Sequence, residues 1–163
     1  MNSVQWVLIV LTLLSGTQAS ALSCLRPDVA EAFNAAAASE DAYVVVHGRF
    51  KFTTPPSRDT GNINAPREVS YIAQFDGRYL AEDGFRTAPS LPVTVTHTCT
   101  AAWCGQLTAG VQTLAYLKQT ATGYSIDVGP CGGQAFAEPS RQDLARVEAC
   151  MRGDRCERMT RLR

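Results

Sequence analysis

The stretch from Val93 to Cys131 reads VTVTHTCTAAWCGQLTAGVQTLAYLKQTATGYSIDVGPC, and it decides the fold of the chain. Apolar and polar residues alternate strictly over residues 92–99, which is typical of a strand with one buried face. Residues 111–119 and 124–128 predict two further strands, and the turn at 120–123 joins them into a hairpin. The stretch also carries three of the six cysteines of the chain.

Two more strands are expected upstream of this stretch. Residues 42–52 form a β-branched and aromatic run, and Gly48 in its middle predicts a bulge or a sharp bend of the kind that curls a strand around a small barrel. After a polar loop at 53–66, residues 68–75 alternate again. We expect this strand to end in a turn at Asp76-Gly77.

A helix is expected at each end of the domain. The first spans residues 27–38, with Pro27 in its first turn. The second begins at Ser140, which forms a capping-box pattern with Asp143, and Gly153 is expected to end it. Five strands and two helices predict a mainly β (α+β) fold, a small five-stranded closed barrel of OB type. A two-sheet sandwich is the alternative.

The N-terminus has the pattern of a secretory signal peptide. Residues 1–21 lack charge, contain the apolar run Val7–Leu14 and end in Ala19-Ser20-Ala21, an A-x-A cleavage site. A buried N-terminal helix is the alternative. We therefore expect residues 22–163 to form a single domain that is secreted, periplasmic or at the cell surface. All six cysteines follow the signal, so three disulfides are expected in an oxidising compartment.

Residues 21–24 (Ala-Leu-Ser-Cys) weakly match a lipoprotein processing box, in which Cys24 would carry a lipid. A surface lipoprotein is therefore a further alternative. Without a lipid on Cys24, no membrane association is expected.

Composition and motifs argue against several classes of function. The net charge is zero, which argues against nucleic acid as a partner. The chain has no G-x-S-x-G motif, and the acidic pairs Glu40-Asp41 and Glu82-Asp83 are expected in turns, so we predict no enzyme and no catalytic residue. His47 and His97 are the only histidines, and we expect neither a metal site nor a cofactor. A monomer is expected.

Several short motifs occur in an order that resembles the netrin-like family, whose best-known members are the tissue inhibitors of metalloproteinases. The similarity covers nearly all of the chain after the signal. The motifs are Cys24 before an alanine-rich helix, AYVVVHGRF at residues 42–50, Trp103-Cys104-Gly105, the strand with Tyr116-Leu117, the strand from Tyr124 to Cys131, and the last helix with Cys150.

The resemblance implies a disulfide pattern and identifies a departure from the family. The inhibitors begin with Cys-x-Cys, and the first cysteine chelates the zinc ion of the target protease. That position falls on Leu22 here, and a further early cysteine of the family is replaced by Asn34. The two additional cysteines, Cys99 and Cys156, compensate for these losses. The implied disulfides are Cys24–Cys131, Cys99–Cys104 and Cys150–Cys156.

The resemblance also implies a function and a site. The chain is expected to be an exported, non-enzymatic binding module with a protein partner. Inhibition of a metalloendopeptidase through the mature N-terminus is the main alternative, and a purely structural module is another. The site would lie at the N-terminus and the neighbouring loop, with Trp103 either an exposed anchor or part of the core. Its residues are Leu22, Ser23, Cys24, Leu25, Trp103, Cys104 and Gly105.

Arg152-Gly153-Asp154 lies between Cys150 and Cys156, and it resembles the integrin-binding tripeptide of adhesive proteins. The simpler interpretation is that Gly153 ends the last helix.

Overall fold

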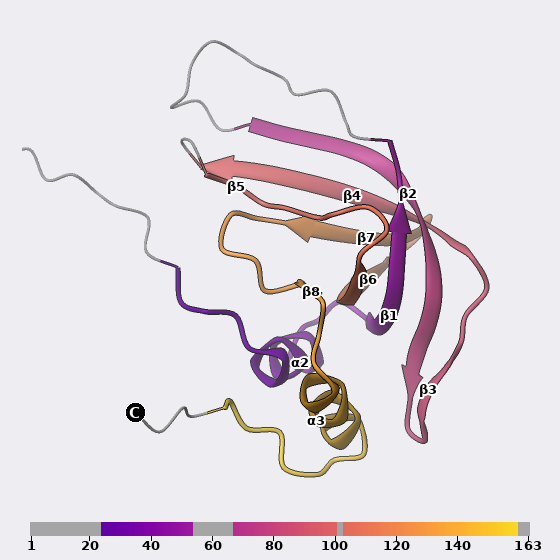
Figure 1. The fold of residues 1–163 in the computed structure, drawn as a ribbon, viewed down its shortest axis with the longest axis vertical. Helices are drawn as coiled ribbons and strands as arrows, with labels where there is room; N and C mark the ends of the chain where they lie inside the picture. The colour runs from indigo at the N-terminus through magenta and orange to yellow at the C-terminus, as the bar shows by residue number, and fades with distance from the viewer. Residues whose placement is uncertain (1–23, 54–66, 101–102, 160–163) are drawn as a thin grey trace, which may run out of the picture.

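The structure is a computed structural model that describes residues 24–53, 67–100 and 103–159 (Figure 1). The predicted signal peptide, residues 54–66 of the predicted loop at 53–66, and Leu22 and Ser23 lie outside the described residues. The helices are α2 (Val29–Ala37) and α3 (Arg141–Met151). The strands are β1 (Tyr43–Lys51), β2 (Arg67–Ala81), β3 (Gly84–Thr87), β4 (Leu91–Thr100), β5 (Trp103–Cys104), β6 (Gln112–Thr120), β7 (Gly123–Val128) and β8 (Ala135–Ala137).

Five of these strands close into a barrel. The order is β1–β2–β4–β7–β6, and β6 pairs with β1 to complete the circle. β4 and β7 run parallel, whereas the other neighbours in the barrel are antiparallel. Closure satisfies the backbone hydrogen bonds that an open sheet leaves at its edges. The predicted OB-like barrel with two helices is confirmed, and the alternative sandwich is wrong.

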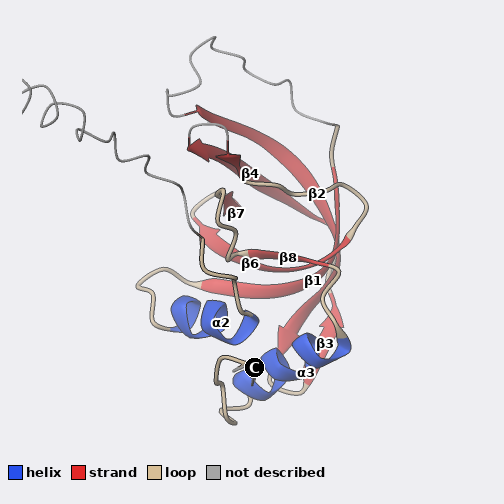
Figure 2. Cartoon of the chain, turned by 60° about the vertical axis from the view of Figure 1, so that its left-hand side comes forward, coloured by secondary structure: helices blue, strands red, loops and turns tan. Residues whose placement is uncertain are grey.

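The apolar residues form two adjoining cores. Inside the barrel, every second residue of the strands points inward, as Val46 and Phe50 do on β1. A second core lies between the barrel and the two helices, which cover the same side of it (Figure 2). Leu114 and Tyr116 on β6 belong to this second core, while Leu117 belongs to the first, so β6 is buried on both faces.

Gly48 and Asp76-Gly77 differ from the prediction. β1 pairs without a bulge on both sides, and Gly48 lies directly opposite Gly77 in the middle of β2. A Cβ on Gly48 would lie 2.2 Å from the backbone oxygen of Asp76 and 2.8 Å from the Phe75 ring. The predicted turn at Asp76-Gly77 is therefore wrong, because these glycines allow a close approach of two strands and an aromatic ring. The chain reverses instead at residues 82–83.

Three short strands, β3, β5 and β8, extend the barrel strands and were not predicted. β3 pairs with the end of β2, β5 with the end of β4, and β8 with β6. Each has two to four residues, which is too few to produce a recognisable period.

The helices follow their capping residues. Ser140 caps α3 with the predicted capping box to Asp143, and Gly153, with φ of +79°, follows the end of the helix as expected. α2 is shorter than predicted, because Asp28 is its N-cap and Pro27 lies before it. Within the described part of the chain, neither helix combines the length and the apolar character required to cross a bilayer.

Candidate functional site

The structure contains the three disulfides that the resemblance implies. Cys24–Cys131 joins residues 107 positions apart, and chain entropy gives it roughly 4–5 kcal/mol of stabilisation. Cys99–Cys104 and Cys150–Cys156 close short loops, each worth about 2 kcal/mol by the same argument. The long disulfide fixes the start of the described chain to the loop that follows β7.

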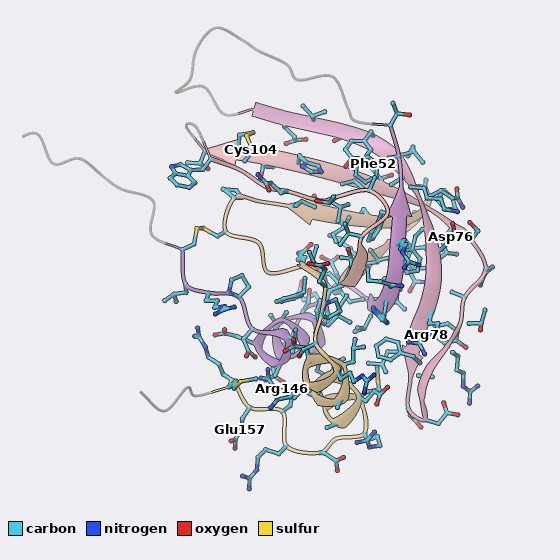
Figure 3. The ribbon with its side chains drawn as sticks, viewed as in Figure 1. Phe52, Asp76, Arg78, Cys104, Arg146 and Glu157 are labelled. Carbon is cyan, nitrogen blue, oxygen red and sulfur yellow. A yellow bond between two sulfur atoms is a disulfide. The ribbon has the colours of Figure 1, made fainter. Side chains whose placement is uncertain are left out.

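Trp103 is exposed at the tip of the β4–β5 hairpin. Its side chain is 63% exposed, and its strand partner is Thr100. The neighbouring Cys104 lies opposite Cys99 and is bonded to it, which fixes the base of the hairpin (Figure 3). Of the two alternatives for Trp103, the exposed position is confirmed and the core position is wrong, while its role as an anchor stays a prediction.

Gly105 joins the Trp103 hairpin to the loop that carries Cys131. Its N–H donates to the carbonyl of Thr98 at 3.0 Å. A Cβ at this position would lie 1.8 Å from the carbonyl oxygen of Val128, so only glycine fits. Val128 is followed after two residues by Cys131, which holds Cys24. The Trp103 hairpin and the N-terminal segment therefore meet the same loop: Gly105 packs against Val128, and Cys24 is bonded to Cys131.

Tyr71 and His97, which sequence reasoning did not assign to the site, hold Gly105 from the other side. His97 Nδ1 lies 3.0 Å from the carbonyl oxygen of Gly105, and its Nε2 lies 2.8 Å from the hydroxyl of Tyr71. A carbonyl can only accept, so His97 Nδ1 donates to Gly105, and in the neutral imidazole Nε2 then accepts from the Tyr71 hydroxyl. Burial raises the pKa of Tyr71 to about 12, which keeps this donor protonated at neutral pH.

Leu25 stands beside a shallow apolar pocket. Its side chain is 79% exposed, the most exposed large apolar side chain among the described residues. The pocket has a volume of about 330 Å³ and lies between the N-terminal segment, α2 and the loop at 131–133. The residues that line it are Leu25, Arg26, Pro27, Asp28, Glu31, Ala32, Ala35, Cys131, Gly132 and Gly133.

Asp28 ties the N-terminal segment to the C-terminal part of the chain. Its carboxylate caps α2 and lies 2.8 Å from the guanidinium of Arg146, with both side chains largely buried. Burial opposes ionisation, but the bond from Arg146 and backbone N–H groups together hold the pKa of Asp28 below its usual value. Arg146 also donates to the carbonyl of Glu157, so the segment after α3 is fixed against α2 (Figure 3).

The Arg-Gly-Asp sequence does not present two separate charges. Arg152 Nε lies 3.2 Å from Asp154 Oδ2, and the two side chains form an ion pair with each other. Gly153 has a positive φ at the end of α3, which is the simpler of the two interpretations of this tripeptide.

The candidate site thus contains two exposed apolar side chains, Leu25 and Trp103, each next to a disulfide-bonded cysteine. Among the described residues, no group of three or more His, Cys, Asp or Glu side chains lies close enough to hold a metal ion. In comparisons with protein-family models, with curated proteins and with solved structures, the chain has no match.

Proposed function

We propose that the chain is an exported, non-enzymatic binding module of the netrin-like type, which recognises another protein through its N-terminal surface. We define this surface as Leu22–Leu25 together with Trp103–Gly105. One observation supports the proposal most directly: Leu25 and Trp103 are 79% and 63% exposed, and each lies next to a disulfide-bonded cysteine, Cys24 or Cys104. No cofactor is part of this proposal, and the module is a monomer.

The energetics of binding favour this surface as a contact site. Tryptophan is enriched among the few residues that contribute most of the affinity of a protein interface. A side chain on a flexible loop would lose conformational entropy on binding, at a cost of about 0.5–1.5 kcal/mol for each ordered side chain. Here, the disulfides Cys24–Cys131 and Cys99–Cys104 have already fixed the backbone at Cys24, next to Leu25, and at Cys104, next to Trp103.

Export is supported by the three disulfides, because such bonds persist in oxidising compartments. The lipoprotein alternative conflicts with one of them. A thioether-linked lipid on Cys24 and the Cys24–Cys131 disulfide use the same sulfur atom and exclude each other. Intact-mass measurement of the exported protein tests this: a start at Leu22 with three disulfides supports the proposal, and diacylglycerol on Cys24 contradicts it.

The binding surface is tested with a photo-crosslinking amino acid placed at position 103 or at position 72. Ile72 on β2 is a matched control, because its side chain is also 63% exposed. The proposal predicts that a partner from the extracellular fraction of the host crosslinks at position 103 and not at position 72. Trp103→Ala and Leu25→Ser should abolish binding of that partner, and Ile72→Ser should not. Equal crosslinking at both positions would contradict the proposal.

Metalloendopeptidase inhibition is the second candidate. The observation that favours it is that Cys24–Cys131 fixes the chain two residues after Leu22, the predicted mature N-terminus. Leu22 lacks the disulfide that the inhibitors have at this position, so ordering a free Leu22 amine on zinc costs additional entropy. Inhibition of a zinc protease by mature protein, and its loss on N-terminal acetylation, would support this candidate. Inhibition that acetylation leaves unchanged would exclude chelation by the amine.

A further inference from the structure

A second cluster of polar side chains lies on the outer face of β1 and β2. It includes residues near the end of β2, whereas the start of β2 pairs with β4 near the β4–β5 hairpin. His47 and Arg49 are two positions apart on β1, so they share one face of the strand. Arg78 on β2 is the strand partner of His47. Figure 3 draws Arg78 and Asp76 on the opposite side of the molecule from Cys104, so this cluster is separate from the N-terminal surface.

Arg78 is held by two ring systems. Its guanidinium carbon lies 5.4 Å from the centre of the Phe85 ring, a cation–π contact, and one of its Nη atoms lies 3.3 Å from His47 Nδ1. The His47 and Phe85 rings meet edge to face at 5.7 Å. The three side chains therefore fix one another, and Arg78 is positioned in advance of any ligand.

Arg49 is held by an amide and not by a carboxylate. The amide oxygen of Gln112 accepts from both Nη atoms of Arg49, at 3.1 and 3.2 Å, in the amide orientation that satisfies both groups. Asp76 is the strand partner of Arg49, but its carboxylate pairs with Lys51 at 2.7 Å and accepts from the Ser90 hydroxyl. Within the described residues, neither Arg49 nor Arg78 has an ion pair, in contrast to Arg86 with Asp83.

His47 contributes a third donor to the same face. A guanidinium can only donate, so Nδ1 of His47 accepts from Arg78 and the ring proton of the neutral imidazole is on Nε2. Burial, and then the positive charges of Arg78 and Arg49, lower the pKa of His47 below its usual value. No partner of Nε2 is found among the described residues, so its N–H group is available to a ligand.

We propose that Arg49, Arg78 and the Nε2–H group of His47 form a binding site for a tetrahedral oxyanion, carried as a phosphate or sulfate group. Two unpaired guanidinium groups match the charge of a phosphate monoester, which is about −1.5 to −2 at neutral pH. Guanidinium donors suit the oxygens of such a group, because they offer two parallel hydrogen bonds each. The Phe85 ring provides apolar surface for the carbon part of the ligand. The site is independent of the proposed protein-binding function.

The charged groups around His47 determine how binding is detected. Arg49 is on its own strand, Arg78 and Asp76 are on β2, and the neighbouring side chains from β3 and β6 are Phe85 and Leu114. An anion between the two guanidinium groups offsets their repulsion of a protonated imidazole. Binding should therefore raise the pKa of His47, and by linkage sulfate, whose own charge is constant around neutral pH, should bind more tightly at lower pH.

The experiment is an NMR titration of the histidine ring protons with inorganic phosphate, sulfate, acetate and chloride at equal ionic strength. His97 is an internal control, because both of its ring nitrogens are bonded within the fold. We expect saturable shifts of His47, and not of His97, with phosphate or sulfate. Tighter binding of phosphate would indicate a phosphate group, and tighter binding of sulfate would indicate a sulfate group.

The anion affinities of arginine variants show whether the anion binds at this site or only screens the charge of the whole protein. Arg49→Gln and Arg78→Gln should each weaken binding at least about threefold, because each removes a charged donor. Arg141→Gln is the matched control, since Arg141 is an exposed arginine at the start of α3, and it should leave binding unchanged. If Arg78→Gln does not fold, Arg78→Lys replaces it. This variant keeps the charge but loses the paired donors of the guanidinium group, so it should also weaken binding. Equal shifts with chloride or acetate, or equal affinity of the Arg49→Gln and Arg141→Gln proteins, would overturn the proposal.

Discussion

Gly48 and Gly77 lie directly opposite each other across β1 and β2, and the ring of Phe75 rests on both. A Cβ on either glycine would lie 2.6 Å from the Cα of the other and less than 3 Å from the Phe75 ring. This contact sets the spacing of β1 and β2 at the centre of the barrel. Phe75 is fully buried and packs against Phe50 with ring centres 5.1 Å apart, so the ring has no free space into which it can move.

Gly48→Ala is therefore expected to destabilise the protein. Overpacking of a filled core costs typically about 1–3 kcal/mol, and the contact with the backbone of Asp76 places this variant at the upper end. Urea unfolding measures the loss. Gly129→Ala is the control, because its Cβ would meet only the Thr98 hydroxyl, at an ordinary 3.5 Å. A Gly48→Ala protein as stable as Gly129→Ala would contradict this account of the barrel.

The two glycines also show which part of the fold the sequence could predict. The five barrel strands were predictable because each has alternating or continuous apolar residues over five or more positions. Asp76-Gly77 has the composition of a tight turn, and only the packing of Phe75 in three dimensions makes it the middle of a long strand. Local sequence does not contain that information.

The candidate site was predictable to a smaller extent. The positions of Trp103 and Gly105 followed from the family resemblance, but the exposure of Trp103 did not, because an apolar residue before a cysteine is equally compatible with a core. The contact between Tyr71 and His97 joins strands 26 residues apart, and Asp28 meets Arg146 across 118 residues. Such pairs depend on strand register and helix packing, which no local pattern specifies.

Asp28→Asn is expected to lower stability in a pH-dependent way. Asparagine keeps the N-cap of α2, so the variant isolates the charge that pairs with Arg146. The loss should be about 1–3 kcal/mol at neutral pH, since the bond is to a charged and largely buried partner. Asp28→Ala should cost about 1 kcal/mol more, because it also removes the cap.

The pH dependence of the Asp28→Asn effect has a defined sign. The folded-state pKa of Asp28 lies below the usual value of 3.8, so the carboxylate contributes stability above that pH. The difference in unfolding free energy between wild type and Asp28→Asn should be constant at neutral pH and should shrink as the pH falls below 3.8. Asp154→Asn, at an exposed ion pair with Arg152, should show little effect at any pH. A difference independent of pH would mean that the charge of Asp28 is not what stabilises α2.

Trp103→Ala is expected to leave the fold nearly unchanged. An exposed side chain contributes little to the core, so the change in unfolding free energy should stay within about 0.5 kcal/mol. Phe50→Ala provides the contrast, because Phe50 is fully buried and truncation of such a residue costs about 3–5 kcal/mol. Thermal unfolding compares the two variants. A large loss in Trp103→Ala would show that the indole ring packs into the protein in solution.

Tyr71→Phe tests the hydrogen bond that holds the Trp103 hairpin through His97 and Gly105. The variant removes the hydroxyl that donates to His97 Nε2. It should lower the free energy of unfolding by about 0.5–1.5 kcal/mol below pH 10. Burial raises the folded-state pKa of Tyr71 from its usual value of 10.0 to about 12. The stability that Tyr71 contributes is therefore complete below pH 10 and is lost as the pH rises toward 12. The difference between wild type and Tyr71→Phe should shrink over that interval, measured by urea unfolding at a series of pH values. Tyr124→Phe on β7 is the control, because it also removes a tyrosine hydroxyl, but His97 Nε2 is bonded to Tyr71 and not to Tyr124. If the two variants behaved alike, the hydroxyl of Tyr71 would have no measurable role in fixing His97, and the hydrogen bond from Gly105 to Thr98 and the contact of Gly105 with Val128 would be enough to hold Gly105.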